Sequence, residues 1–374
     1  MSKNKSKQAK TKKEKVLVKT LQVRVRDKHA NVLSEMARSV NFVWNYVNDL
    51  SYRFIREKSR FLSYNDLEKY TTGANKELGL HSQTVQNTVK EYVYRRNQFK
   101  KARLKWRVSH RNNPKYSLGW IPVNTGQASW KNGQVYHNGH YFKVWDSYGL
   151  SKYKFKTASF TEDSRGRWYF NVVVAVDTKK EYERAKKAQG EVGLDLGLKD
   201  IVTTSDGDRM VEKHFYRNMQ QKLAVAQRAR HKKRVRAIHA KIKNRRNDAH
   251  HKFTRSLVNR YGTIYVGNVS SSKLVKTKMA KSVLDAGWSK MKIMLDYKCD
   301  HAGTIFREVN EAYTTVTCSS CGSRESRNAP RGKAGLRIRE WTCECGVTHD
   351  RDVNASTNIL AVGHDRLDGG IPGL

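Results

Sequence analysis

Two aspartates in the C-terminal half of the chain have surroundings typical of carboxylates that hold a divalent cation. Asp195 ends a short apolar run that predicts a buried strand, and Gly197 then allows the chain to turn into a second strand over residues 201–204. Asp352 lies at the start of a predicted helix whose apolar face would contact a sheet. Simpler explanations exist for both, because an aspartate beside glycine is often a turn residue and an aspartate at a helix start is often the N-cap.

Four of the five cysteines form two tight pairs, Cys318 with Cys321 and Cys343 with Cys345. Thiolates in two such pairs are the ligand set of a closed, structural Zn²⁺ site, and they fit a reducing compartment better than a disulfide framework does. The second pair has a spacer of one residue, shorter than the usual two, which could strain a tetrahedral site. Cys299 lies in an apolar segment, and we expect it to be buried and inert.

The chain carries a large excess of positive charge, with 74 Lys and Arg against 34 Asp and Glu and a net charge of +40 over 374 residues. Such an excess repels itself unless a polyanion neutralises it, so it argues against an ordinary enzyme of small molecules and for a nucleic-acid-binding protein. A solvated basic surface or a ribosome-associated protein would show a similar balance. Residues 213–260, expected as one long helical stretch, hold 16 Lys and Arg against a single acid, Asp248.

Composition and periodicity divide the chain into segments. In the N-terminal half, a helical pattern lies between two segments with strand patterns. A charged segment with few apolar residues then precedes the C-terminal half. The expected segments are a basic disordered arm (1–15), a basic β-barrel (16–28 and 108–178), a helical domain (29–107), a linker (179–190), an α/β domain (191–312 and 347–363), a ribbon (313–346) and a tail (364–374). No apolar run reaches the roughly 18–20 residues that span a bilayer, so we expect no membrane partner, and no secretory signal either.

Several elements within these segments can be placed. Phe42 and Trp44 lie in an amphipathic helical pattern, where we expect both to be core residues, and a second helix is predicted over residues 82–98. Residues 154–176 predict a hairpin that turns at residues 163–166.

In the C-terminal half, residues 263–266 and 304–309 predict strands, with a helix over residues 286–301 between them. A strand, a helix and a strand after a long crossover argue for parallel pairing. A carboxylate at the end of the first strand, followed by a returning strand, is how RNase-H-like folds present the first ligand of a catalytic metal.

Taken together, these motifs resemble a known family. GLDLGLKD at residues 193–200, the cysteine pairs and HDRDVNASTNIL at residues 349–360 are similar to the TnpB proteins of insertion-sequence transposons, relatives of type V CRISPR effectors. The resemblance implies an α+β multidomain fold: an N-terminal β-barrel (wedge) domain with an inserted helical recognition domain, and a C-terminal RNase-H-like (RuvC) α/β domain with an inserted zinc ribbon. It implies an RNA-guided DNA endonuclease whose partners are a guide RNA from the transposon end and double-stranded target DNA with a short flanking motif. We expect it in the prokaryotic cytoplasm, at the nucleoid when bound.

The resemblance also implies an Asp, Glu, Asp triad that holds Mg²⁺ or Mn²⁺. Asp195 and Asp352 match the two aspartates, whereas the position of the glutamate is Gly267, which offers no side-chain ligand. Either the protein is a nuclease-dead, RNA-guided DNA-binding repressor, or the carboxylate has moved. A direct part in strand transfer is a weaker third hypothesis, because we find no pair of histidines around a hydrophobic residue with a downstream tyrosine nucleophile.

Glu311 is the candidate for a moved carboxylate. If the strand that ends near residue 309 lies parallel to the strand that ends at Gly267, their ends are roughly 5 Å apart and Glu311 could reach the same cavity. Glu308 is the weaker candidate because it lies within the strand, and Glu311 could instead be an ordinary loop residue. In the active case, two metal ions about 3.5–4 Å apart would act on a DNA phosphate, with Asp195 bridging them and Asp352 and Glu311 holding one side each.

Overall fold

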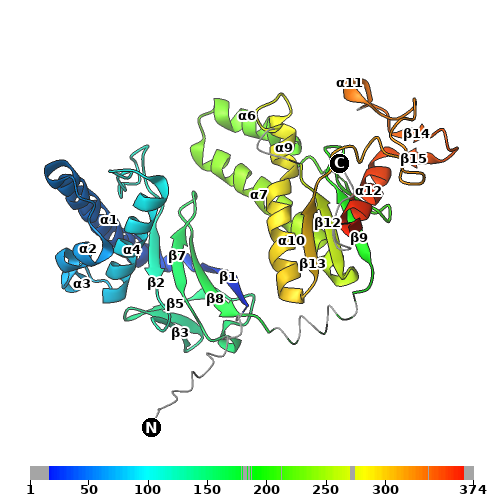
Figure 1. Ribbon diagram of the computed structural model, residues 1–374. Coiled ribbons are helices and arrows are strands. Elements are labelled where there is room, and N and C mark those ends of the chain that lie inside the picture. The colour runs from blue at the N-terminus through cyan, green and yellow to red at the C-terminus, as the bar shows by residue number, and fades with distance from the viewer. Residues whose placement is uncertain are drawn as a thin grey trace, which may run out of the picture. The chain divides into compact units, whose positions relative to one another are not determined.

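The protein is described by a computed structural model over residues 17–365, apart from residues 178, 180–182, 184, 185, 187, 212, 270–273 and 336. The predicted arm, nearly all of the predicted tail and much of the predicted linker therefore lie outside the described residues. The chain forms two compact units, Met1–Val176 and Asp177–Leu374 (Figure 1). Within the part of the chain that is described, no helix is long and apolar enough to cross a membrane.

The first unit contains a five-stranded antiparallel sheet in the order β2-β7-β8-β1-β6. Buried and exposed residues alternate along its central strands because successive side chains point to opposite faces. The predicted hairpin is confirmed as β7 and β8, with Gly166 in the left-handed conformation at the turn. The strands are β1 (Val18–Val25), β2 (Trp120–Val123), β6 (Val144–Trp145), β7 (Ala158–Glu162) and β8 (Trp168–Ala175).

A smaller antiparallel sheet of β3 (Ala128–Lys131), β4 (Gln134–His137) and β5 (His140–Phe142) shares the core of the first unit. Phe142 from this sheet packs against Phe160 of β7, with ring centroids 5.0 Å apart. The expected barrel thus consists of two sheets around one core, and among the described residues their ladders do not close into a single ring.

Helices α1 (Ala30–Lys58), α2 (Tyr64–Thr71), α3 (Ala74–Glu77) and α4 (Ser82–Phe99) complete the first unit and confirm both predicted helices. Trp44 is buried as expected, but the prediction for Phe42 is wrong, because 61% of the residue is exposed. Residues at positions 33, 36, 40, 43, 44 and 47 form the buried face of α1. Phe42 is two residues from both 40 and 44, which turns it to the opposite side of the helix.

The second unit is built on a mixed sheet in the order β11-β10-β9-β12-β13. The strands are β9 (Glu191–Asp195), β10 (Asp200–Thr204), β11 (Arg209–Val211), β12 (Thr263–Gly267) and β13 (Ile305–Val309). The first three strands pair in antiparallel fashion, whereas β12 is parallel to both β9 and β13. The predicted parallel pairing is therefore confirmed.

Helices cover the two faces of this sheet. Ile264 and Val266 of β12 share a core with Leu257 of α7 and Met291 of α10, whereas Tyr265 between them packs with Ile359 of α12. Alternate residues of one strand thus contact helices on opposite faces. The helices are α6 (Gln220–Arg228), α7 (Lys232–Arg260), α9 (Ala280–Ala286), α10 (Trp288–Ala302) and α12 (Arg351–Asp365).

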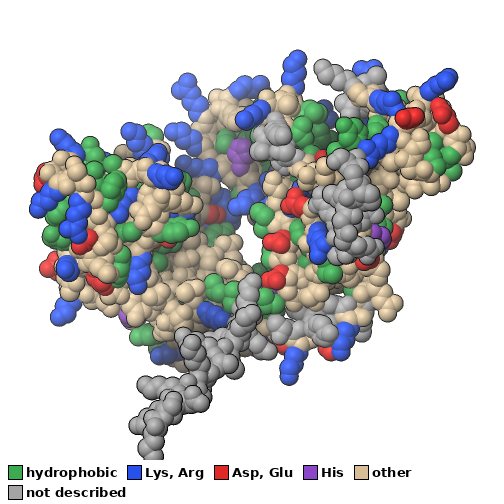
Figure 2. All heavy atoms as spheres, in the orientation of Figure 1, with side chains coloured by type: hydrophobic (Ala, Val, Ile, Leu, Met, Phe, Trp, Pro, Cys, Tyr) green, Lys and Arg blue, Asp and Glu red, His purple; other side chains and the backbone are tan. Residues whose placement is uncertain are grey.

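The expected single helix over residues 213–260 is wrong in one respect, because it is broken between α6 and α7. Arg230 at the break has a φ of 53°, and α6 folds back so that Leu223 and Ala226 pack against Ile238 and Ile242 of α7. Every Lys and Arg between residues 230 and 245 is exposed. Figure 2 shows Lys and Arg side chains distributed over the visible surface of both units.

Candidate active site

Asp195 is the last residue of β9, where Thr203 of the returning strand lies opposite it. Its position depends on how closely α12 approaches the sheet. A Cβ atom added to Gly193 would lie 2.0 Å from the backbone oxygen of Ser356, and one added to Gly363 would lie 2.4 Å from the Tyr265 ring. Glycine at both positions therefore lets α12, which carries Asp352, lie directly on the strands that carry Asp195 and Gly267.

Asp352 is buried in the first turn of α12 and is not its N-cap. Asp350 has that role, because its Oδ1 accepts hydrogen bonds from the backbone N–H groups of Asp352 and Val353, both at 3.0 Å. The Asp352 carboxylate is left to contact Arg351 at 2.6 Å and Arg339 at 3.1 Å. The simpler explanation of Asp352 as a helix cap is thereby excluded, and the sequence signal for Asp350 was its position just before the apolar helical pattern.

Glu311 follows β13 by two residues, and Gly267 lies opposite Val309 in the parallel ladder. A Cβ atom added to Gly267 would lie 2.2 Å from Oε2 of Glu311 and 3.3 Å from its Cδ. The Glu311 carboxylate thus fills the space into which a side chain at position 267 would project. The half-buried Glu311 is therefore not simply an exposed loop residue.

Asp352 and Glu311 both lie close enough to Asp195 for their charges to act on its carboxylate. Burial, then the negative charge of Asp352, then that of Glu311 raises the pKa of Asp195 to about 7. Burial also raises the pKa of Glu311, while the Lys292 ammonium opposes that shift. A buried carboxylate whose ionisation is disfavoured by neighbouring carboxylates is typical of sites that a cation stabilises.

Glu308, the weaker candidate, is already paired. Its Oε2 accepts a hydrogen bond from Nζ of Lys292 at 2.7 Å, and Lys292 itself is largely buried on α10. Of the two glutamates near the end of β13, Glu311 is thus the one that reaches the space above Gly267.

Two asparagines of α12 hold the turn that follows Glu311. The side-chain amide of Asn358 donates to the backbone oxygens of Thr314 at 2.8 Å and Thr317 at 2.7 Å. Asn354 donates to the Thr317 oxygen at 2.7 Å and accepts from the N–H of Ser319 at 2.8 Å. Both asparagines are buried, so the helix that carries Asp352 also fixes the turn between Glu311 and the first cysteine pair. Nothing in the sequence pattern indicated this structural role of Asn354 and Asn358.

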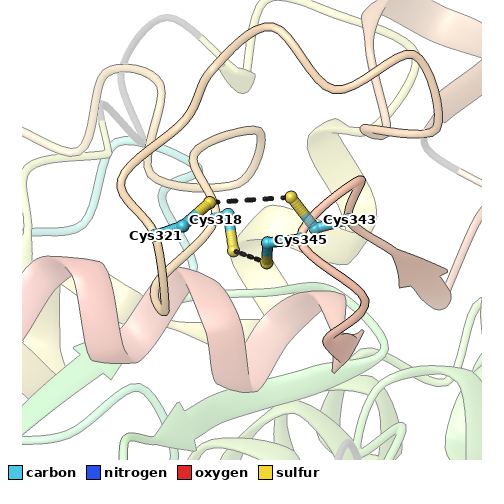
Figure 3. Close-up of side chains that lie close together, drawn as sticks. All are labelled: Cys318, Cys321, Cys343 and Cys345. Carbon is cyan, nitrogen blue, oxygen red and sulfur yellow. Dashed lines mark hydrogen bonds between the residues drawn. The ribbon is translucent and has the colours of Figure 1, made fainter.

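The four predicted cysteines converge in the ribbon, above α12 (Figure 3). Their Sγ atoms all lie within 4.8 Å of one another, so the one-residue spacer between Cys343 and Cys345 does not prevent a shared site. Cys343 follows β14 (Glu340–Thr342), and β15 (Thr348–Asp350) leads back to α12. The arrangement could hold a metal ion. Cys299 is buried in α10, away from this group, as predicted.

His349 is a neighbour of the cysteine group that the spacing did not indicate. Its Nε2 lies 3.0 Å from Sγ of Cys318, and its ring packs against Trp341 with centroids 5.0 Å apart. The sequence around His349 does not predict this contact, because the contact depends on the pairing of β14 with β15.

Two family models match parts of the chain. The model described as "Probable transposase" (OrfB_IS605) matches residues 171–278, and the model described as "Cas12f1-like, TNB domain" matches residues 288–359. Among solved structures, a Cas12f1 chain in complex with sgRNA and target DNA has a TM-score of 0.56 at 13% identity, with 92% of this chain and 98% of that chain covered. This likeness shows a shared α+β fold.

Curated relatives agree with these models. A Streptomyces pristinaespiralis protein named "Putative RNA-guided DNA endonuclease" is 34% identical over 221 residues, 55% of this chain and 52% of the relative. The Escherichia coli (strain K12) protein "Putative RNA-guided DNA endonuclease InsQ" is 28% identical, over 54% of this chain and 55% of the relative. The chain spans about half the length of these relatives. "TnpB-like protein L79" of Acanthamoeba polyphaga mimivirus is a further match, 28% identical over 236 residues. The family models and the curated relatives together support a similarity of this chain to the TnpB family.

Proposed function

We propose that this protein is an RNA-guided DNA endonuclease that hydrolyses phosphodiester bonds in guide-matched DNA, with Asp195, Glu311 and Asp352 as its catalytic residues. The observation that carries this proposal is the occupation of the space above Gly267 by the Glu311 carboxylate. The end of β13 supplies the glutamate that the end of β12 lacks. A third carboxylate in this position supports a relocated nuclease site over a vestigial one.

The carboxylates fit a hard divalent cation, because they offer only oxygen ligands, and because burial and the negative charges of Asp352 and Glu311 raise the pKa of Asp195 to about 7. Mg²⁺ or Mn²⁺, when bound, would activate a water molecule and stabilise the leaving oxygen. Asp195 would hold such an ion together with Asp352 and Glu311, whose negative charges both act on its carboxylate. Arg351 and Arg339 form ion pairs with the Asp352 carboxylate and thereby orient it.

The cysteine group fits Zn²⁺, since Cys318, Cys321, Cys343 and Cys345 bring four sulfur atoms within 4.8 Å of one another. We assign it a structural role. The pairs are joined to α12 through Asn354 and β15, so a bound ion would hold together the ribbon and the start of the helix that carries Asp352.

The partners are a guide RNA from the transposon end and double-stranded DNA with a short flanking motif. The net charge of +40 supports binding of both polyanions. We assign the wedge domain to residues 16–28 and 108–178, the recognition domain to 29–107, the RuvC-like domain to 191–312 and 347–363, and the zinc ribbon to 313–346. Base pairing with the guide would supply most of the sequence specificity.

The test uses the full chain purified with its co-expressed RNA, incubated with a guide-matched plasmid and Mg²⁺. We expect cleavage by the wild type, none by Asp195→Ala or Glu311→Ala, and guided binding by both variants within a few-fold of wild type. Glu308→Gln is the matched control, because it lies three residues from Glu311 and should retain cleavage.

The second candidate function is guided DNA binding without cleavage, which Gly267 favours. Tight guided binding by the wild type, with no cleavage in Mg²⁺ or Mn²⁺, would establish that function and contradict the first.

A further inference from the structure

Two of the sequence motifs each contain a second aspartate that has no part in the proposed triad. Asp200 ends the motif GLDLGLKD, five residues after Asp195, and Asp350 lies two residues before Asp352 in HDRDVNASTNIL. Arg209 binds both of these aspartates: its Nη1 donates to Oδ2 of Asp200 at 3.0 Å, and its Nη2 donates to Oδ2 of Asp350 at 2.7 Å. One guanidinium thus joins the two motifs that carry two of the candidate metal ligands.

The contacts of Arg209 connect the edge of the sheet with the end of the ribbon. Arg209 begins the edge strand β11, and Asp200 is a buried residue of the neighbouring strand β10. Asp350 ends β15 and lies 141 positions further along the chain than Arg209. A guanidinium presents its N–H donors in a fixed plane, so it can hold two carboxylates from different elements in one arrangement. Arg209 therefore holds the end of β15 against the sheet.

Asp350 uses its two carboxylate oxygens for different contacts. Its Oδ2 accepts from Arg209. Its Oδ1 caps α12 by accepting from the backbone N–H groups of Asp352 and Val353, both at 3.0 Å. The orientation of one oxygen depends on that of the other, because both belong to one planar group. The position of the first turn of α12, and of the Asp352 carboxylate on it, is therefore linked to Arg209 through Asp350.

We propose that Arg209 is a positioning residue: by holding Asp350, it places Asp352 where it can share a divalent cation with the other two carboxylates. Its guanidinium is bound to Asp200 and Asp350, so it acts on Asp352 through the helix cap. That the cation serves DNA cleavage rests on the proposed function. The binding of the cation, and the effect of Arg209 on that binding, can be measured without cleavage.

The binding test uses the full chain, treated with ribonuclease to remove bound RNA, and follows the electron paramagnetic resonance signal of free Mn²⁺, which falls as the ion binds. Removing Arg209 alone would leave the buried Asp200 charge uncompensated, so Arg209→Ala is made in an Asp200→Asn background. We expect this double variant to bind Mn²⁺ about 10- to 100-fold more weakly than Asp200→Asn does, the usual effect of losing a residue that orients a metal ligand. Asp195→Asn measures the Mn²⁺ binding that does not involve the carboxylates.

The direction of the change separates positioning from simpler effects. Loss of a positive charge by itself would strengthen the binding of a cation, and partial unfolding would lower the number of ions bound per chain rather than their affinity. Arg260→Ala is the matched control, because Arg260 pairs with Asp208 at 2.6 Å in the same unit and should leave the Mn²⁺ affinity at or above that of the wild type. Arg209→Lys should have an intermediate affinity, since one ammonium cannot reproduce the two-sided contact. An unchanged affinity in the double variant, or an equal loss in Arg260→Ala, would overturn the role of Arg209.

Cleavage of guide-matched plasmid by the chain with its co-expressed RNA distinguishes this proposal from the proposed function. If the wild type cuts and the double variant needs about 10-fold or more Mn²⁺ for half-maximal cleavage, with the rate recovered at saturating Mn²⁺, both proposals stand. If the wild type cuts and the double variant responds to Mn²⁺ as Asp200→Asn does, the positioning role is wrong and the nuclease stands. If the wild type does not cut but Mn²⁺ binding that depends on Asp195 also depends on Arg209, the nuclease is wrong and the positioning role stands. If no Mn²⁺ binding depends on Asp195, both are wrong.

Discussion

Gly267 and Glu311 are complementary across the β12–β13 ladder: the first lacks a side chain where the second places a carboxylate, with Oε2 only 2.2 Å from the position of a Cβ atom at residue 267. A side chain at position 267 would therefore displace the end of the Glu311 side chain. The relationship predicts that the glutamate could be exchanged between two adjacent strand ends.

The exchange can be tested by moving the glutamate. Glu311→Ala should lower the cleavage rate by about 100-fold or more, the scale on which removal of one stabilising group acts. Adding Gly267→Glu to Glu311→Ala should restore part of that loss, measured as single-turnover plasmid cleavage. Gly267→Ala alone is the control, and should slow cleavage because its Cβ atom displaces Glu311. Failure of the double variant to exceed Glu311→Ala would contradict an exchangeable position.

The asparagine contacts of α12 should stabilise the turn after Glu311. Asn358→Leu removes two buried hydrogen bonds to the Thr314 and Thr317 oxygens, and should lower the free energy of unfolding by about 1–3 kcal/mol. Urea unfolding followed by circular dichroism measures this change. Asn328→Ala, which removes one bond from an exposed residue of the ribbon, should change stability by less than about 0.5 kcal/mol. Equal effects of the two substitutions would argue against the asparagine contacts.

The cysteine group should contain one zinc ion per chain by elemental analysis. Cys345→Ala should lose the ion, because it removes one of the four sulfur atoms that lie within 4.8 Å of one another. Cys299→Ala should keep it, since Cys299 is buried in α10 and outside the group. A chain that lacks zinc when purified without chelators, or a Cys345→Ala variant that retains it fully, would exclude the assignment.

His250 should make the protein less stable in mild acid. The residue is fully buried on α7, and burial, with the nearby Arg246 charge, lowers its pKa to about 4. The unfolded chain, with a pKa near 6.5, binds more protons between pH 4 and 6.5, so stability is fully present above pH 6.5 and falls as the pH drops towards 4. The shift corresponds to about 3 kcal/mol at most.

Urea unfolding of the metal-free protein at pH 7 and pH 4.5 measures this loss. His250→Leu should reduce the difference between the two pH values. His239→Leu, an exposed histidine of the same helix, is the matched control and should keep the wild-type difference. An unchanged difference in His250→Leu would mean that other groups cause the acid sensitivity.

Local sequence patterns predicted most of the secondary structure and most of the candidate site. Asp195 at a strand end, the two cysteine pairs and the parallel order of β12 and β13 follow from period, spacing and crossover length. The meeting of Glu311 with Gly267 was predictable because it needed only the register of two adjacent strands.

Other features depend on contacts that no local pattern encodes. The break at Arg230 contains neither glycine nor proline, and it follows from the packing of α6 on α7. The contact of Asn358 with Thr314 joins residues 44 positions apart. The prediction for Phe42 failed because it relied on the apolar side chain and ignored the position of residue 42 around the axis of α1, which directs the side chain to the solvent.

Helix α12 packs closely against the sheet at Gly193 and Gly363. Backbone touches backbone at one of these positions and an aromatic ring at the other, so neither accepts even a methyl group. In the proposed exchange, the carboxylate could come from either of two strand ends, whereas the distance between α12 and the sheet could not change. Substitutions could then move the carboxylate from one strand to its neighbour, but Gly193 and Gly363 would have to remain glycine.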